Sequence, residues 1–188
     1  MAKQFSQIEP NIRDFIGRQH VFFTASAAAG SRVNISPREA RALRVLDANK
    51  VVYLDQTGSG NETSAHVRAD GQMTIMFCAF QGAPLILRLY GKGRIIARGT
   101  AEYAALLAAE FGGEEQVGAR QMVELAVDLV QTSCGYGVPL FDYAGERPSL
   151  TRWAESKGEE GLAKYRRDKN KRSIDGLPTY FADAEETV

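Results

Sequence analysis

A strand, a glycine-rich turn and the start of a helix follow one another within Val51–His66, and this stretch constrains the fold more than any other. Its first four residues are apolar, which predicts a buried strand. Ser59 and Glu62 in the turn have the spacing of a capping box, which predicts that a helix begins here. A glycine turn at a helix start exposes backbone N–H groups at the positive end of the helix dipole. The stretch therefore predicts a site for an anion such as phosphate.

A second interpretation of the turn needs no ligand. Many strand-to-helix turns contain glycines and only begin a helix, so the spacing by itself leaves both interpretations open. The turn is not a nucleotide-binding P-loop, because no lysine follows its glycines. It is not a dinucleotide fingerprint either, because Thr63 stands where that motif has its third glycine. Nucleoside triphosphatases and Rossmann-type enzymes are therefore disfavoured.

Apolar runs and alternating patterns predict a mainly β chain with several helices. Ala119–Thr132 contains helix-forming residues, but Val123, Leu125, Val127 and Leu129 alternate with Glu124, Ala126, Asp128 and Val130, which favours a strand. The six expected strands are Val21–Ala25, Arg32–Ser36, Val51–Asp55, Met73–Phe80, Leu85–Ala97 and Ala119–Thr132. The expected helices are Ile8–Arg18, Asn61–Ala69, Ala101–Phe111 and Leu150–Lys171.

Glycine and proline positions predict where these elements end or bend. Pro37 is expected to end the second strand, because proline cannot donate a hydrogen bond to a ladder. The charged stretch Arg38–Val45 is expected to be a loop or a single helical turn. Gly91 and Gly93 should bend the fifth strand, and Gly158 should break the C-terminal helix.

The 188 residues suit one domain, and their charges narrow the classes of partner. With 23 basic and 23 acidic residues, the balance of charge gives no reason to expect nucleic acid or an anionic membrane. The basic run Arg166–Arg172 is accordingly expected to be a solvated helix end. Cys78 and Cys134 form no Cys-x-x-Cys pair, so no metal site is expected. Because the chain shows neither a signal core nor an apolar run of roughly 20 residues, the expected location is the cytoplasm.

Four further stretches, read together with the glycine turn, connect the chain to a known family. They are RVNISP at 32–37, TIMFCAFQGAPLILRLYGKG at 74–93, TSCGYGVPLFDY at 132–143 and SIDGLPTYF at 173–181. In this order, from about Phe15 to Phe181, the chain resembles the pyridoxamine 5′-phosphate oxidase-related, FMN-binding split-barrel family. The resemblance implies one six-stranded antiparallel split barrel over residues 1–188. An N-terminal helix in 1–19 would accompany it, and a C-terminal helix and tail in 149–188 would pack on the barrel or on a partner.

The resemblance also implies a homodimer that holds FMN at the subunit interface. Met73–Phe80 is apolar at nearly every position and is expected to be buried on both faces. A small split barrel cannot cover both faces of such a strand alone. The sequence therefore supports the expectation of a second copy.

The resemblance assigns candidate FMN contacts to three parts of the chain. Asn34 and Ser36 lie on the polar face of a strand that would run beside the isoalloxazine ring. The turn Gly58–Ser64 would hold the phosphate and the ribityl chain. Tyr136, in the corner after the last strand, would either stack on the ring or belong to a turn that only reverses the chain. The candidate contacts in the turn, with Ser59, Asn61 and Thr63 foremost, also include Gly58, Gly60 and Ser64.

The positive charge that a phosphate requires must come from outside the turn, because the turn carries Glu62 and no basic residue. Arg38, which follows the corner at Pro37, is one candidate. Arg88 lies among leucines in a strand, where it either pairs with an acidic residue or faces the FMN phosphate or the substrate. His66 either bonds Glu62 one helical turn away or contacts the flavin or the substrate.

Two functions fit a member of this family. The first is an FMN-dependent oxidoreductase, in which the flavin carries out hydride or electron transfer and the protein supplies binding and orientation. The second is a non-catalytic protein that senses, stores or only binds flavin. Pyridoxamine 5′-phosphate oxidase activity goes with a C-terminal Arg-x-His pair in this family, and no histidine follows His66 here. We therefore expect a different substrate, and the sequence identifies no catalytic residue.

Overall fold

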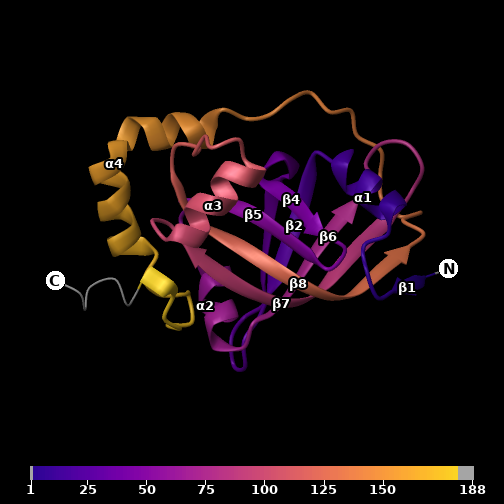
Figure 1. Cartoon of the computed structure of the whole chain (residues 1–188), viewed down its shortest axis with the longest axis horizontal. Coiled ribbons are helices and arrows are strands. Elements are labelled where there is room, and N and C mark those ends of the chain that lie inside the picture. The colour runs from indigo at the N-terminus through magenta and orange to yellow at the C-terminus, as the bar shows by residue number, and fades with distance from the viewer. Residues whose placement is uncertain (1, 182–188) are drawn as a thin grey trace.

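An antiparallel sheet of eight strands makes up most of the computed structural model, which describes residues 2–181 (Figure 1). The strands are β1 (Lys3–Phe5), β2 (Val21–Ser26), β3 (Asn34–Glu39), β4 (Leu43–Asp47), β5 (Lys50–Gln56), β6 (Gln72–Cys78), β7 (Ile86–Ala97) and β8 (Ala119–Ser133). Across the sheet they follow the order β3–β2–β6–β7–β8–β5–β4, and β1 pairs with β8 off this path. The sheet curls into a half-barrel with helices at its flanks (Figure 1). This architecture confirms the predicted fold class, with eight strands in place of six.

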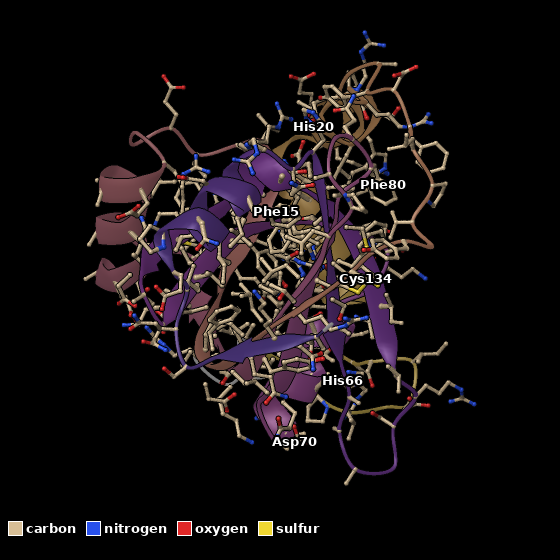
Figure 2. The ribbon with its side chains drawn as sticks, turned by 90° about the vertical axis from the view of Figure 1, so that its right-hand side faces the viewer. Phe15, His20, His66, Asp70, Phe80 and Cys134 are labelled. Atoms are coloured by element: carbon tan, nitrogen blue, oxygen red, sulfur yellow. The ribbon has the colours of Figure 1, made fainter. Side chains whose placement is uncertain are left out.

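Apolar side chains from one face of the curled sheet fill the interior of the half-barrel. The ring of Phe22 lies at its centre, with centroids 5.5 Å from Tyr53 and 5.8 Å from Phe77. Helix α1 (Pro10–Gly17) adds the buried Ile12, Phe15 and Ile16 to this cluster, and Figure 2 shows Phe15 among the interior side chains. Each large apolar side chain that is fully buried contributes about 1.5–3 kcal/mol, so this cluster is the main source of stability.

Strand β5, which lies between β8 and the edge strand β4, is buried on both of its faces. Val51 and Tyr53 belong to the interior cluster, whereas Val52 and Leu54 pack under helix α3 (Ala101–Glu110). A strand covered on both sides reads as a continuous apolar run, which is why the sequence at this position shows no alternation. Burial of the strand therefore fixes the position of its polar C-terminal end and of the glycine turn that follows it.

The helices lie where the sequence predicted them. They are α1, α2 (Glu62–Ala69), α3 and α4 (Ser149–Lys169). Gly158 breaks α4 with φ 65° and ψ 172°, as predicted. No helix within residues 2–181 is long and apolar enough to cross a bilayer. Of the predicted C-terminal tail, residues 182–188 lie outside the described part of the chain.

Between residues 37 and 47 one prediction is wrong and one is confirmed only in part. Pro37 does not end its strand but pairs with Phe23 inside β3. The proline is tolerated because β3 is the edge of the sheet. The stretch Arg38–Val45, predicted to be a loop or a single helical turn, contains one turn of 3₁₀ helix (Ala40–Ala42), but it also contains the end of β3 and the start of β4. β4 lies at the opposite edge and is only half-buried, so its sequence lacks a clear strand pattern.

The expectation for β6 also changes. Met73, Ile75 and Phe77 are buried in the interior, but Thr74 and Met76 on the other face are only half-buried. Within a single chain, the outer face of β6 is therefore covered only in part.

The pairing of β7 with β8 shifts register at Gly91. Tyr90 pairs with Leu129 and Gly91 with Val127, so the extra residue, Asp128, lies in β8. A Cβ atom at Gly91 would lie 1.9 Å from the carbonyl oxygen of Ala126, so the two backbones approach too closely for any side chain. We expect Gly91→Ala to lower the free energy of unfolding by about 3 kcal/mol, measured by urea denaturation. Gly137→Ala is the control, because no atom lies within 4 Å of its Cβ position. It should change stability by less than about 0.5 kcal/mol, and an equal loss in both variants would contradict the packing argument.

Candidate functional site

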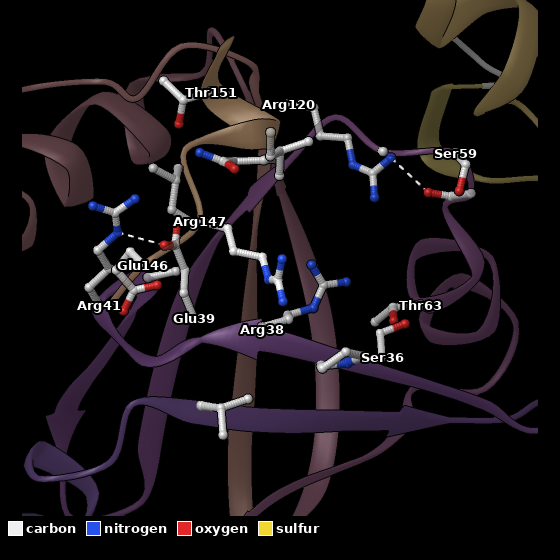
Figure 3. A pocket seen from close by; sticks show the side chains of 18 of the residues that line it. Ser36, Arg38, Glu39, Arg41, Ser59, Thr63, Arg120, Glu146, Arg147 and Thr151 are labelled. Atoms are coloured by element: carbon white, nitrogen blue, oxygen red, sulfur yellow. Dashed lines mark hydrogen bonds and ion pairs between the residues drawn. The ribbon is translucent and has the colours of Figure 1, made fainter. Parts of the chain in front are cut away.

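A cavity of about 770 Å³ lies between the edge strand β3, the glycine turn after β5 and the segment that leads into α4 (Figure 3). This volume lies within the range of roughly 300–1,000 Å³ that small-molecule sites occupy. Arg38, Arg120 and Arg147 reach it from three distant parts of the chain. Figure 3 shows the guanidinium groups of Arg38 and Arg147 directed toward the same space. The cavity is therefore a candidate site for an anionic ligand.

Asp55, at the end of β5, holds two of these arginines at the cavity wall. Its Oδ1 accepts a hydrogen bond from Nη1 of Arg38 at 2.5 Å, and its Oδ2 accepts one from Nε of Arg120 at 2.8 Å. Gln121, the cross-strand neighbour of Asp55, donates a third bond to Oδ2 at 2.8 Å. The side chains of Asp55 and Arg120 are only 1% and 4% exposed. The pairing of β5 with β8 thus brings the carboxylate and Arg120 together away from solvent.

The electrostatics of this cluster favour an anion in the cavity. Burial alone would raise the pKa of Asp55, but Arg120 and Arg38 outweigh burial and lower that pKa below its usual value. Burial likewise acts to lower the pKa of Arg38, and the Asp55 carboxylate outweighs it, so the pKa of Arg38 is raised. The Asp55 carboxylate and the Arg38 guanidinium are therefore charged at neutral pH. Two cations share one anion, which leaves a positive charge at the wall.

The glycine turn offers backbone donors to the same cavity. Gly58, Ser59, Gly60 and Thr63 line it. Within the described residues, no backbone N–H from 58 to 64 donates a hydrogen bond, and the first bonded N–H of α2 is that of Ala65. Free N–H groups at a helix start are the anion-binding arrangement that the sequence predicted.

Seven of the predicted contact residues line this one cavity: Asn34, Ser36, Arg38, Gly58, Ser59, Gly60 and Thr63. Asn61 and Ser64 lie just behind it and are buried, with side-chain oxygens that accept bonds from Gln121 and from the backbone N–H of Tyr180. Arg88 and Tyr136 lie elsewhere. Arg88 is half-buried on the outer face of β7 and donates to the hydroxyl of Ser133, not to an acidic residue. Tyr136 is 83% exposed in the turn after β8.

Three local predictions for the turn and its helix are wrong. Asn61, not Ser59, is the N-cap residue of α2, and Glu62 does not close a capping box. The carboxylate of Glu62 accepts instead from the backbone N–H of Ile174, with both oxygens at 3.1 Å. His66 does not bond Glu62; its Nδ1 lies 3.1 Å from the hydroxyl of Ser26 in a fully buried position. For Glu62 and His66, a partner distant in sequence replaces the local one.

The backbone at position 60 does not require a glycine. Its φ is not positive, and a Cβ there would meet only the flexible carboxylate of Glu62, at 3.5 Å. A substitution at Gly60 therefore tests the ligand and not the fold.

Sequence reasoning missed Arg120, Arg147 and the C-terminal end of α4. The run Arg166–Arg172 was predicted to be solvated, but Arg166 and Asn170 within it are buried against the glycine turn. Arg120 lies at the start of the long alternating strand β8, where no motif marks it as a site residue. The only available signal was that Arg120 is the one basic residue in the stretch Ala119–Ser133.

A second cavity, of about 1190 Å³, adjoins the first and shares His20 with it. Its lining includes the aromatic side chains of Phe15, Phe80 and Phe141. Tyr143 stacks on His20 with ring centroids 3.7 Å apart and planes 2° from parallel. This cavity is larger but lacks the cluster of arginines and free N–H groups, so the first cavity remains the candidate site for an anion.

An antiparallel half-barrel with an arginine-lined cavity at one edge defines a class of small split-barrel proteins. The chain belongs to the pyridoxamine 5′-phosphate oxidase family, because the model of that family matches residues 8–134. This confirms the predicted family. The pyridoxamine 5′-phosphate oxidase family protein ustO of Aspergillus flavus is 38% identical over 192 residues, which cover 93% of this chain and 76% of ustO. HupZ of Group A Streptococcus shares the fold, with a TM-score of 0.55 and 23% identity over 67% of this chain and 99% of its own.

The cluster around Asp55 predicts a specific loss of stability. Asp55→Asn leaves the guanidinium groups of Arg38 and Arg120 buried without their carboxylate. We expect the free energy of unfolding at pH 7 to fall by roughly 3–5 kcal/mol. Because the pKa of Asp55 is lowered in the folded state, its contribution is complete above the unfolded pKa of about 4 and is lost as the pH falls further. Urea denaturation at several pH values should therefore show a weaker acid dependence in the variant.

Asp168→Asn is the matched control, because Asp168 pairs with Lys164 on the exposed face of α4. It should leave both the stability and its acid dependence close to those of the wild type. An Asp55→Asn variant as stable as the wild type at pH 7 would contradict the proposed role of the carboxylate.

Proposed function

We propose that this protein binds FMN in the arginine-lined cavity and acts as an FMN-dependent oxidoreductase. The observation that carries the proposal is the convergence on one cavity of a turn with free N–H groups and of Arg38 and Arg120. A phosphate monoester dianion needs several donors and a positive field, and this wall supplies both. Membership of the pyridoxamine 5′-phosphate oxidase family supports FMN as the particular flavin.

The residues of the cavity fit the chemistry of FMN. The phosphate would lie at the wall formed by Arg38, Arg120 and the turn, where Ser59 and Thr63 add hydroxyl donors. Asn34 and Ser36 line the cavity from β3 and would meet the polar parts of the molecule. The bond from Nδ2 of Asn34 to Oγ1 of Thr63, at 3.3 Å, joins β3 to α2 and holds the two walls together.

When bound, FMN supplies hydride or electron transfer. The part of this chain is to bind the flavin, to orient it and to set the charge around it. Arg38 and Arg120 keep their positive charge in a cluster sheltered from solvent, and Asp55 fixes their positions. Because no histidine follows His66, the C-terminal Arg-x-His pair of pyridoxamine 5′-phosphate oxidases is missing, and we propose a different substrate.

We further propose that the protein is a homodimer with FMN at the subunit interface. Val33 and Ile35, at the edge of the sheet beside the candidate site, are 68% and 65% exposed. The outer face of β6 is only half-covered within one chain. Apolar surface of this kind next to a ligand site is typical of an interaction surface.

The FMN proposal predicts a phosphate-dependent affinity. Purified protein should be yellow and should release FMN, not FAD, on denaturation. Arg38→Met should weaken FMN binding by about ten- to a hundredfold, because one charged hydrogen-bond donor to the phosphate is lost. Riboflavin, which lacks the phosphate, should bind the wild type more weakly and should lose little further affinity in the variant. Flavin fluorescence titrations measure both affinities.

Arg88→Met is the control for these titrations, because Arg88 lies outside the cavity. If Arg88→Met loses FMN affinity and Arg38→Met does not, the phosphate binds at the outer face of β7 and not in the cavity. Protein that takes up no added FMN would contradict the proposal entirely. Turnover with reduced nicotinamide and an electron acceptor, compared with the apoprotein, distinguishes an oxidoreductase from a protein that only binds flavin.

The dimer proposal predicts the molecular mass in solution. Light scattering should give twice the mass of the chain at micromolar concentration, since interfaces of this kind bury about 2,000 Å² or more. Ile35→Lys places a charge on the exposed edge strand and should shift the mass toward that of the monomer. Val117→Lys, at an exposed apolar position after α3, should leave the mass unchanged. A wild-type monomer that still binds flavin would overturn the proposal.

A further inference from the structure

The end of α4 and the segment after it wrap around the glycine turn. Nε of Arg166 donates to the hydroxyl of Thr57 at 2.8 Å, at the first residue of the turn. The backbone N–H of Ile174 donates to the carboxylate of Glu62, and that of Tyr180 donates to the hydroxyl of Ser64. The C-terminal segment thus donates hydrogen bonds to side chains of the turn and of the first residues of α2.

Asn170 makes the central contacts of this segment. Its side chain is fully buried. Oδ1 accepts a bond from Nη1 of Arg120 at 2.9 Å, and Nδ2 donates to the carbonyl oxygen of Gly58 at 3.0 Å. Its own carbonyl accepts from the hydroxyl of Thr179 at 2.6 Å, which fixes the residue from the far side. The amide therefore connects the arginine and the turn that form the anion-binding wall.

The two carbonyl bonds of the turn determine the direction of its N–H groups. In a planar trans peptide, C=O and N–H point in opposite directions. The carbonyl of Gly58 points to Asn170, so the N–H of Ser59 points away from it. The carbonyl of Gly60 accepts a hydrogen bond from Arg120 at 2.9 Å, so the N–H of Asn61 points away from Arg120. If the bond to Asn170 is lost, the first of these peptides can rotate and Arg120 loses one of its supports.

We propose that Asn170 is a positioning residue for the phosphate of the ligand. It holds the Gly58–Gly60 turn and Arg120 in the one arrangement that presents their donors together, although it does not line the cavity itself. This inference rests on the proposed anion site. An asparagine at a helix end that served only its own helix would not direct both ends of its amide to groups outside that helix.

The test compares FMN with riboflavin in two variants of the full-length protein. Asn170→Ala removes both contacts. Asn170→Asp keeps the size of the side chain and its acceptor toward Arg120, but it cannot donate to Gly58 and adds a negative charge near the phosphate. We expect FMN affinity to fall by about tenfold or more in each variant, and riboflavin affinity by about threefold or less.

Asn49→Ala is the matched control. The amide of Asn49 also joins separate segments, with bonds from Nδ2 to the carbonyl oxygens of Ser6 at 2.7 Å and Val127 at 3.0 Å, but it lies away from the cavity. This variant should lose stability while keeping the wild-type ratio of FMN affinity to riboflavin affinity. A purely structural role of Asn170 predicts the same behaviour for the Asn170 variants, and that result would overturn the inference.

Inorganic pyrophosphate separates a failure of this inference from a failure of the proposed function. It should raise the thermal unfolding midpoint of the wild type, because it binds only the folded anion site, and it should raise that of Asn170→Asp much less. If pyrophosphate stabilises the wild type much more than Asn170→Asp, but the wild type shows no preference for FMN over riboflavin, the flavin proposal fails and the positioning role stands. If Asn170→Asp responds to pyrophosphate as the wild type does, the positioning role is overturned.

Discussion

The candidate site depends on one buried carboxylate. Asp55 is almost completely buried and accepts hydrogen bonds from Arg38, which precedes it in the chain, and from Arg120, which follows it. A buried charge is tolerated only when it is paired and hydrogen-bonded, so the three side chains must be placed together or not at all. The sheet satisfies this condition, since the pairing of β5 with β8 sets Gln121 opposite Asp55 and Arg120 beside it. The register of β5 against β8 therefore determines where the positive charges of the cavity wall lie.

The rest of the cavity consists of segments that the barrel brings to this wall. β3 can carry Arg38 there because it is an edge strand that accepts Pro37 in its middle. The glycine turn extends from the rigid strand β5, and its free N–H groups face no competing acceptor within residues 2–181. The end of α4 holds the turn from behind through Arg166 and Asn170. Packing of the apolar core thus fixes the positions of the polar groups that form the site.

Sequence reasoning succeeded where one strand or helix carries its own signal. The alternation of Val123, Leu125 and Val127 predicted β8 correctly against helical propensity, and the apolar run before the glycine turn predicted β5. It failed at β4, a short edge strand whose half-buried residues show no regular pattern. It failed again at the capping box, because the backbone N–H of Ile174 competes for Glu62 and lies far along the chain. Local spacing cannot report such a competitor.

By itself, the sequence determined the class of fold, the family, the glycine turn and seven residues of one cavity, because strand periodicity, turn chemistry and motif order are local properties. Only the tertiary structure decided which charged and amide side chains lie beside that turn. Arg120 and Asn170 carry no distinguishing pattern in the sequence, and their roles arise because strand pairing and helix packing bury them against Asp55 and Gly58. Burial makes unpaired charges and amides costly, so the folded chain pairs groups from distant positions that no local spacing relates.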